Sequence, residues 1–282
     1  MIDSTNRVKK MALISDLTGY GRCSLAVALP VVSVLGIQAC PIPTAIFSNH
    51  LAYPFWHKDD YTPHIQDYLS CWDKLHFSFD GILCGFLGNG KQADIHAVYI
   101  EKQKKDHQSL FILDPVMGDH GKLYSSVTLD YSSAIKTLLP YADILTPNLT
   151  EACFLTDTPF PDKMPNLSFL ASMTEKLHAL GPAKIVVTGL YENGYYHNYI
   201  WQAGREPVIC TTKAGGPSRP GTGDLFASII AADALNQIPF SDSVKKAAEF
   251  VRICTEDSAA CDIPINEGVC FERNLKYLIQ TG

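Results

Sequence analysis

Segments typical of β-strands and of α-helices alternate along most of this chain, and that alternation constrains its fold more than any other feature. Strand patterns occupy residues 11–14, 37–48, 81–84, 109–113, 143–145 and 183–188, and helix patterns occupy residues 24–35, 63–76, 93–105, 128–139 and 167–180. We expect the first strand to end at residue 14, before a Gly/Arg turn. Strands separated by helices of this length predict a parallel sheet that helices cover on both faces. A hairpin is predicted from residues 195–201 and 208–212, turning at Ala203-Gly204, and two helices follow at 223–236 and 241–261.

The bulk composition predicts a single globular domain over residues 1–282. The chain is 46% hydrophobic and 18% charged, and it has no internal repeat and no Pro/Ser/Gly-rich linker. Its net charge of −6 argues against a nucleic-acid partner and against an anionic membrane surface. No apolar run approaches the length of a membrane span, no signal peptide is visible in residues 1–10, and the nine cysteines form no Cys-x-x-Cys pair. We therefore expect a cytoplasmic protein with reduced cysteines.

Polar residues stand at the ends of three predicted strands. Asp114 follows the strand at 109–113, Thr146 follows the strand at 143–145, and Thr188 ends the strand at 183–188. In open parallel sheets, ligands collect at the carboxyl ends of the strands. These three side chains are therefore predicted to line one edge of the sheet.

A glycine-rich turn at residues 219–228, Arg-Pro-Gly-Thr-Gly-Asp-Leu-Phe-Ala-Ser, carries the strongest chemical signal. Gly221 and Gly223 flank Thr222, and Asp224 follows where an apolar helix begins. The first N–H groups of a helix have no intrahelical partner, and glycines let such a turn approach phosphate oxygens closely. Asp224 could then take a proton from an attacking hydroxyl, as in phosphoryl transfer from a nucleotide to a small alcohol. Ordinary helix capping explains the same residues equally well, so this motif alone leaves both interpretations open.

Two further loops bear carboxylates that suit a magnesium ion. Residues 114–119 read Asp-Pro-Val-Met-Gly-Asp and residues 146–151 read Thr-Pro-Asn-Leu-Thr-Glu. Magnesium in phosphoryl-transfer sites is bound by a few carboxylates and retains several waters, which Asp119 and Glu151 could provide. Each loop alone also fits a turn opener or a helix start. Their predicted meeting at neighbouring strand ends favours the functional interpretation.

The order of four motifs resembles that of a known family. Phe-Ser-Asn-His at 47–50 comes first, followed by the two carboxylate loops at 114–119 and 146–151 and by Gly-Thr-Gly-Asp at 221–224. Together they resemble pyridoxal kinase, within the ribokinase-like superfamily, over about residues 11–262. The resemblance implies a three-layer α/β/α sandwich with a central, mostly parallel sheet. It also implies ATP as phosphoryl donor, Mg²⁺ as cofactor, often a monovalent cation such as K⁺, and a homodimer.

The resemblance assigns roles to single residues. Asp224 matches the catalytic base that faces the 5′-hydroxymethyl group of the vitamin, and Gly221, Thr222 and Gly223 match the anion hole. Asp119 and Glu151 match the acidic residues near the magnesium. The residues expected on the ATP side are Asp114, Thr146, Asn148, Glu151, Thr188 and Tyr124. The residues expected on the vitamin side are Thr18, Asn49, His50, Leu51 and Phe86, together with Asp224.

Two positions depart from the family pattern. Leu51-Ala52 follows Ser-Asn-His where well-studied pyridoxal kinases have Thr-Gly or Thr-Gln, and Phe86 stands where tyrosine is usual. Each change removes a hydroxyl expected beside the vitamin ring. Because hydrogen bonds to substrate polar groups discriminate strongly between substrates, the preferred vitamer stays open. Residues 19–24, Gly-Tyr-Gly-Arg-Cys-Ser, resemble a bacterial branch usually called pyridoxamine kinase.

The leading hypothesis is ATP-dependent phosphorylation of a vitamin B6 vitamer at its 5′-hydroxyl, as in salvage of pyridoxal 5′-phosphate. One alternative is a hydroxymethylpyrimidine kinase of thiamine biosynthesis, although those enzymes commonly have cysteine at the position of Asp224. An alternative of another class is a non-catalytic vitamin B6-binding protein on a kinase scaffold. Such proteins usually lose the base or the anion hole, and this chain keeps both.

Overall fold

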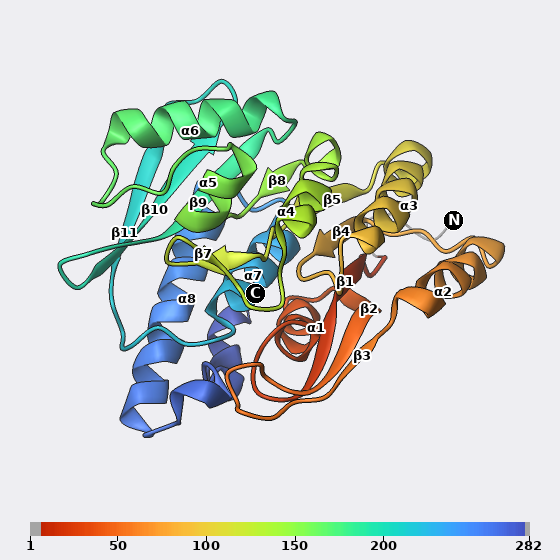
Figure 1. The fold of residues 1–282 in the computed structure, drawn as a ribbon, viewed down its shortest axis with the longest axis horizontal. Coiled ribbons are helices and arrows are strands. Elements are labelled where there is room, and N and C mark those ends of the chain that lie inside the picture. Colours follow the sequence, from red (N-terminus) through yellow and green to blue (C-terminus); the bar gives the residue numbers. More distant parts are fainter. Residues whose placement is uncertain (1–6, 280–282) are drawn as a thin grey trace.

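A nine-stranded sheet forms the centre of the protein in a computed structural model, which describes residues 7–279 (Figure 1). Its strands are β1 (Lys10–Tyr20), β2 (Gln38–Asn49), β3 (Lys58–Asp60), β4 (Gly81–Cys84), β5 (Leu110–Leu113), β8 (Ile144–Leu145), β9 (Lys184–Glu192), β10 (Tyr195–Gln202) and β11 (Val208–Lys213). Their order across the sheet is β11-β10-β9-β8-β5-β4-β1-β2-β3. The six strands from β9 to β2 run parallel, whereas β10 and β11 form an antiparallel hairpin at one edge and β3 pairs antiparallel with β2 at the other. The predicted, mostly parallel sheet is confirmed.

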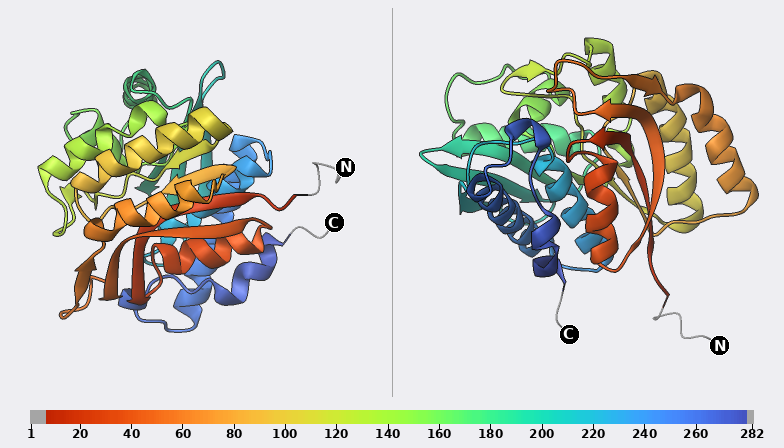
Figure 2. Two further views of the ribbon diagram at one scale, coloured as in Figure 1. Left: turned by 90° about the vertical axis from the view of Figure 1, so that its right-hand side faces the viewer. Right: turned by 90° about the horizontal axis from the view of Figure 1, so that it is seen from below.

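Helices cover both faces of this sheet (Figures 1 and 2). One layer contains α2 (Thr62–Lys74), α3 (Lys91–His107), α4 (Leu129–Lys136), α5 (Leu149–Leu155) and α6 (Leu167–Ala179), and the other contains α1 (Leu25–Val34), α7 (Thr222–Leu235) and α8 (Phe240–Ala260). Short 3-10 helices occupy Leu139–Tyr141, Ile265–Glu267 and Glu272–Leu278. The predicted three-layer α/β/α sandwich is confirmed. None of the helices within residues 7–279 is long and apolar enough to cross a membrane.

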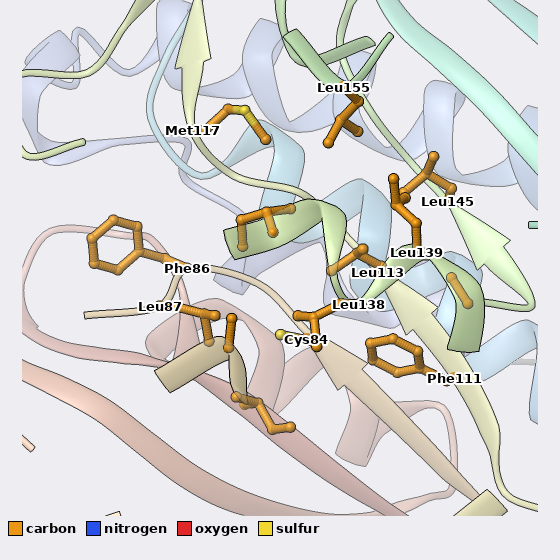
Figure 3. Close-up of a cluster of buried hydrophobic side chains, with 14 of the residues drawn as sticks. Cys84, Phe86, Leu87, Phe111, Leu113, Met117, Leu138, Leu139, Leu145 and Leu155 are labelled. Carbon is orange, nitrogen blue, oxygen red and sulfur yellow. The ribbon is translucent and has the colours of Figure 1, made fainter. Parts of the chain in front are cut away.

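Alternating side chains of the inner strands supply the two cores. In β5, Phe111 and Leu113 pack under the layer that contains α3 and α4, whereas Ile112 packs under α7 and α8. Figure 3 shows the first of these cores, where strand side chains meet Met117 and Leu138 from the loops and helices above. Because both faces are buried, the inner strands read as unbroken apolar runs in the sequence.

The structure corrects the predicted end of the first strand. β1 does not stop at residue 14 but continues to Tyr20, paired with β2 through Leu17–Ile46, Thr18–Phe47 and Tyr20–Asn49 after an irregularity between Ser15 and Leu17. Asp16 and Thr18 in this added part of the strand face a cavity, which is described below.

Two other boundaries and one small ribbon also differ from the prediction. The helix expected at 128–139 ends at Lys136 and gives way to the 3-10 helix around Pro140. The strand expected at 183–188 extends to Glu192, because it pairs with β10 in an antiparallel hairpin, so Thr188 lies within β9 rather than at its end. The loop after β5 contains a small ribbon, β6 (Gly118–Asp119) and β7 (Lys122–Leu123), that the sequence did not reveal.

Candidate active site

The carboxyl ends of the parallel strands surround one cavity of about 940 Å³. The three loops predicted to meet there do meet. Asp114, Glu151 and Asp224 all line this cavity, together with Asp119 on β6. A cavity of this size holds a ligand of drug-like dimensions or larger.

The glycine-rich turn forms the start of α7 at the cavity wall. Gly221 has φ +85°, and a Cβ atom at this position would lie 2.1 Å from the Arg22 carbonyl oxygen, so only glycine fits. Gly223 has open space around its Cα atom, and its residue is exposed. The hydroxyl of Thr222 donates to the Arg219 carbonyl at 3.1 Å, which closes the turn. The first amides of α7 are thereby presented to the cavity, as an anion site requires.

Arg219 connects this turn to the C-terminal segment. Its side chain is 6% exposed, and its guanidinium donates to the carbonyl oxygens of Ile263 at 2.7 Å and Pro264 at 3.2 Å. The Val269 N–H also donates to the Pro220 carbonyl at 3.1 Å. These bonds attach the turn to the C-terminal segment.

Asp224 lies half-buried in the first turn of α7. Burial raises the pKa of its carboxyl to about 6, a hydrogen bond from the Ser24 backbone opposes this, and the charge of Asp16 raises it further. A carboxylate with a pKa near 6 is still ionised at neutral pH and is a stronger base than an exposed aspartate.

Asp114 follows β5 and is 7% exposed. Burial raises its pKa most, the nearby charge of Asp224 adds to the rise, and a hydrogen bond from Thr146 opposes it. The Thr146 hydroxyl donates to the Asp114 carboxylate at 2.8 Å. Thr146 is 3% exposed and is not among the residues that line the cavity. Its side chain therefore contacts Asp114 and does not border the cavity.

Glu151 and Asn148 form a capping box at the start of α5. The Asn148 side chain accepts from the Glu151 N–H at 2.9 Å, and the Glu151 carboxylate accepts from the Asn148 N–H at 2.8 Å and from the Met117 N–H at 3.2 Å. The Asn148 amide donates to the Gly118 carbonyl at 2.8 Å, which attaches the β6–β7 ribbon to α5. Burial, together with the charges of Asp114 and Asp119, raises the pKa of Glu151. The helix-start interpretation of this motif is therefore confirmed, and the same carboxylate still lines the cavity.

Asp119, Tyr124 and Thr188 complete the wall around this half of the cavity. The Asp119 side chain is 46% exposed, and its carboxylate accepts from the His120 N–H at 2.7 Å. Burial and the neighbouring carboxylates raise the pKa of the Tyr124 phenol. The Thr188 N–H donates to the Pro147 carbonyl at 2.9 Å, which joins β9 to the loop before α5. Among residues 7–279, no three His, Cys, Asp or Glu side chains gather closely enough to form a closed metal site.

The other half of the cavity is bounded by β1, β2 and the loop after β4. Thr18, His50, Leu51 and Phe86, which the sequence predicted on the vitamin side, all line it. Phe86 stacks against Tyr131 with ring centroids 6.0 Å apart. Burial lowers the pKa of the His50 imidazole, and its Nδ1 accepts from the Ala52 N–H at 3.2 Å, which supports a structural or lining role.

Asn49 does not face this cavity. Its side-chain amide donates to the Phe55 carbonyl at 2.9 Å and accepts from the Ser48 hydroxyl at 2.7 Å. It lines a separate shallow depression with Tyr20, Tyr53 and Phe55. Asn49 is the last residue of β2, and its hydrogen bonds to Ser48 and Phe55 turn its side chain toward the loop that follows the strand.

The lining residues that sequence reasoning missed include Asp16, Cys23 and Ser24. Asp16 and Thr18 are each 4% exposed whereas Leu17 between them is 38% exposed, which is the period-two pattern of a strand. Because the buried residues here are polar and the exposed one is Leu17, the hydrophobic pattern does not reveal this part of β1, and the sequence predicted a Gly/Arg turn instead.

Comparisons with known proteins agree with this geometry. The sequence model of the family described as phosphomethylpyrimidine kinase matches residues 75–268. A pyridoxal kinase of Arabidopsis thaliana is 30% identical over 229 residues, which cover 77% of this chain and 71% of the relative. For a pyridoxal kinase of Dictyostelium discoideum, at 29% identity, the match covers 64% of this chain and 60% of the relative.

Solved structures show the same fold. A candidate phosphomethylpyrimidine kinase of Bacteroides thetaiotaomicron is 31% identical, with a TM-score of 0.93 over 99% of this chain and 96% of that one. A second crystal form of a protein with the same description contains pyridoxal, and it aligns with a TM-score of 0.91 over 96% of both chains. A pyridoxal kinase of Leishmania donovani in complex with ADP and pyridoxamine has the same fold at 20% identity, with a TM-score of 0.87 over 96% of both chains.

Proposed function

The chain belongs to the pyridoxal kinase family of the ribokinase-like superfamily, a family of kinases with alcohol acceptors, and we propose that it transfers the terminal phosphoryl group of ATP to the 5′-hydroxymethyl group of a vitamin B6 vitamer. The observation that carries this proposal is the position of Asp224. Its carboxylate shares one cavity with the glycine-rich start of α7, with the Asp119–Glu151 loops and with an apolar end at Phe86 and Leu51. A flat aromatic alcohol and a triphosphate require such a two-ended cavity.

Asp224 acts as the general base in this proposal. It accepts the proton of the vitamer hydroxyl as that oxygen attacks the terminal phosphorus, and the bond from this phosphorus to the bridging oxygen of ATP breaks, which leaves ADP. The amides of Gly221, Thr222 and Gly223 donate to the transferring phosphoryl oxygens, where negative charge is concentrated. Asp114 and Asn148, with Thr188 and Tyr124, border the nucleotide in the other half of the cavity.

Magnesium is the metal that the donor atoms suit best. Asp119 presents a partly exposed carboxylate and Glu151 a buried one, and magnesium commonly takes one or two carboxylates together with waters and phosphate oxygens. Asp119 and Glu151 would hold it, and it would neutralise phosphate charge. The resemblance also implies a monovalent cation such as K⁺. Comparison of the activity in K⁺ buffer with the activity in Na⁺ buffer tests whether the enzyme needs K⁺.

The proposal extends to the whole chain as one kinase domain that works in the cytoplasm as a homodimer. Large aromatic side chains near the sheet edge at β3 support a protein contact, since Phe55 is 87% exposed and Trp56 is 50% exposed. Light scattering on the purified chain would give the mass of the particle and so test the dimer.

A substrate panel tests the function directly. Pyridoxal, pyridoxine, pyridoxamine and hydroxymethylpyrimidine are each supplied with MgATP, and ADP formation is followed. We expect turnover with at least one vitamer that exceeds turnover with hydroxymethylpyrimidine. The name of the matching family model favours hydroxymethylpyrimidine as the second candidate substrate. Preference for it would overturn the vitamer assignment, and the absence of any substrate-dependent ATP consumption would favour a binding protein.

A further inference from the structure

A carboxylate that the proposed mechanism does not use lies at the vitamer end of the cavity. Asp16 is on β1, is 4% exposed, and lines the cavity beside Thr18 and across from Phe47 and Phe86. The irregular pairing of β1 with β2 between Ser15 and Leu17 allows Asp16 and Thr18 to face inward while Leu17 faces out.

The side chains that hydrogen-bond to this carboxylate are hydroxyl groups. The Thr18 hydroxyl donates to its Oδ2 atom at 2.8 Å, and the Ser24 hydroxyl also bonds to it. An ionised carboxylate offers about four acceptor positions, so these two donors leave part of its capacity free. A buried carboxylate without a cation is costly, and a second one, Asp224, is close enough for the charge of Asp16 to raise its pKa.

No cation of the described residues contacts Asp16. Within residues 7–279 it takes part in no ion pair. Lys58 acts on it only through space, because its ammonium donates to the Gly88 carbonyl at 2.8 Å. Arg22 is bound to Glu272 at 2.6 Å, and burial keeps His50 neutral by lowering its pKa.

We propose that Asp16 is a substrate-binding residue that accepts a hydrogen bond from a protonated nitrogen of the bound vitamer. This inference rests on the proposed function. Every B6 vitamer contains a pyridine nitrogen, and pyridoxamine also carries an aminomethyl group, so either nitrogen can supply the cation that the pocket lacks. A charged hydrogen bond of this kind orients the ring, and so the 5′-hydroxymethyl group, relative to Asp224.

The test is the near-isosteric variant Asp16→Asn, assayed with pyridoxal, pyridoxine and pyridoxamine. Its side chain can still accept from Thr18 but has no charge. We expect kcat/KM to fall on the order of 10- to 100-fold while the KM for ATP is unchanged. An equal loss for all three vitamers assigns the contact to the ring nitrogen, and a loss confined to pyridoxamine assigns it to the aminomethyl group. The control is Asp59→Asn, which makes the same change at an exposed carboxylate on β3.

A second measurement needs no variant. An analogue of the vitamer with a benzene ring in place of pyridine should bind the wild-type protein on the order of 10- to 100-fold more weakly if the ring nitrogen is the partner. Wild-type kcat/KM for all three vitamers in Asp16→Asn overturns the inference and leaves the kinase assignment intact. A wild-type protein that phosphorylates no vitamer overturns the proposed function itself.

Discussion

Replacement of Asp224 by asparagine separates the role of this carboxylate in catalysis from the effect of its burial on the stability of the fold. The substitution keeps the size of the side chain but removes its ability to take a proton. General bases contribute roughly 10²–10⁴-fold to turnover, so we expect a loss of kcat in that range. The pH profile should change as well. With a pKa of about 6, the wild-type base is ionised above that pH, and kcat/KM should fall about tenfold per pH unit well below it. This acid limb should be absent from the variant.

The same variant should not lose stability. The folded-state pKa of Asp224, about 6, lies above the ordinary aspartate value of 3.8. A carboxyl with a raised pKa favours the folded state only when protonated, so its contribution to stability is lost as the pH rises from about 4 to about 6. The difference corresponds to at most about 3 kcal/mol of destabilisation at neutral pH, and partial exposure of the side chain reduces it. Asp224→Asn removes this cost, so its Tm at pH 7.5 should equal or exceed that of the wild type.

Two assays test the role of Asp224 as general base and the cost of its burial. Steady-state kinetics of ADP release between pH 5 and pH 8 shows whether kcat/KM falls on the acid side, and thermal unfolding at the same pH values gives the Tm. Asp59→Asn is the control for removal of one negative charge. A variant that keeps its turnover within tenfold, or keeps the acid limb near pH 6, refutes Asp224 as the base. A marked drop in Tm at neutral pH would refute the electrostatic reasoning.

Three further predictions concern neighbouring features. Gly221→Ala should destabilise the fold by at least about 2 kcal/mol, because it combines a positive φ with a contact to the Arg22 carbonyl, whereas Gly223→Ala has open space and should keep its Tm while losing turnover. Equal Tm values for the two variants in differential scanning calorimetry would show that the turn is not constrained as described. Glu151→Gln can keep the capping-box bond from the Asn148 N–H but leaves the Met117 N–H without its acceptor, and it should raise the Mg²⁺ concentration for half-maximal activity about tenfold. An unchanged magnesium titration would exclude Glu151 from metal binding. Asp233→Ala should cost about 3 kcal/mol in urea unfolding, since Asp233 is 1% exposed and pairs with a lysine at 2.7 Å; a loss below 1 kcal/mol would contradict this.

The sequence predicted most of the layer architecture, because its signals are local. Runs such as 109–113 are buried on both faces, and the helices between them have the length that a parallel crossover needs. The loops at Asp114, Glu151 and Asp224 were placed correctly for the same reason, since strand direction alone brings the strand ends to one edge of the sheet.

The errors came from effects that are not local. β1 continues past residue 14 because β2 pairs with it and a cavity accepts its polar side chains, and neither fact is visible in the segment itself. The outward position of Asn49 depends on its bond to the Phe55 carbonyl in the loop after β2, and the sequence does not show the conformation of that loop. Thr146 was expected beside a nucleotide, but its bond to Asp114 could be recognised only once the two strand ends were placed side by side.

Helix α7 shows how the fold treats buried carboxylates in two different ways. Asp233, near the end of the helix, accepts from the Ser243 hydroxyl at 3.0 Å and from the Lys246 ammonium at 2.7 Å. Asp224, at its start, faces the cavity, and within residues 7–279 neither it nor Asp16 forms an ion pair. The fold can therefore supply a cation to a buried carboxylate, and it does so where the only neighbours are protein. The fold supplies no such cation to Asp16 and Asp224, which face the cavity, and burial raises the pKa of both carboxyls. An unpaired carboxylate at this wall costs stability in the empty protein, and that cost is recovered only when a ligand brings the proton donor.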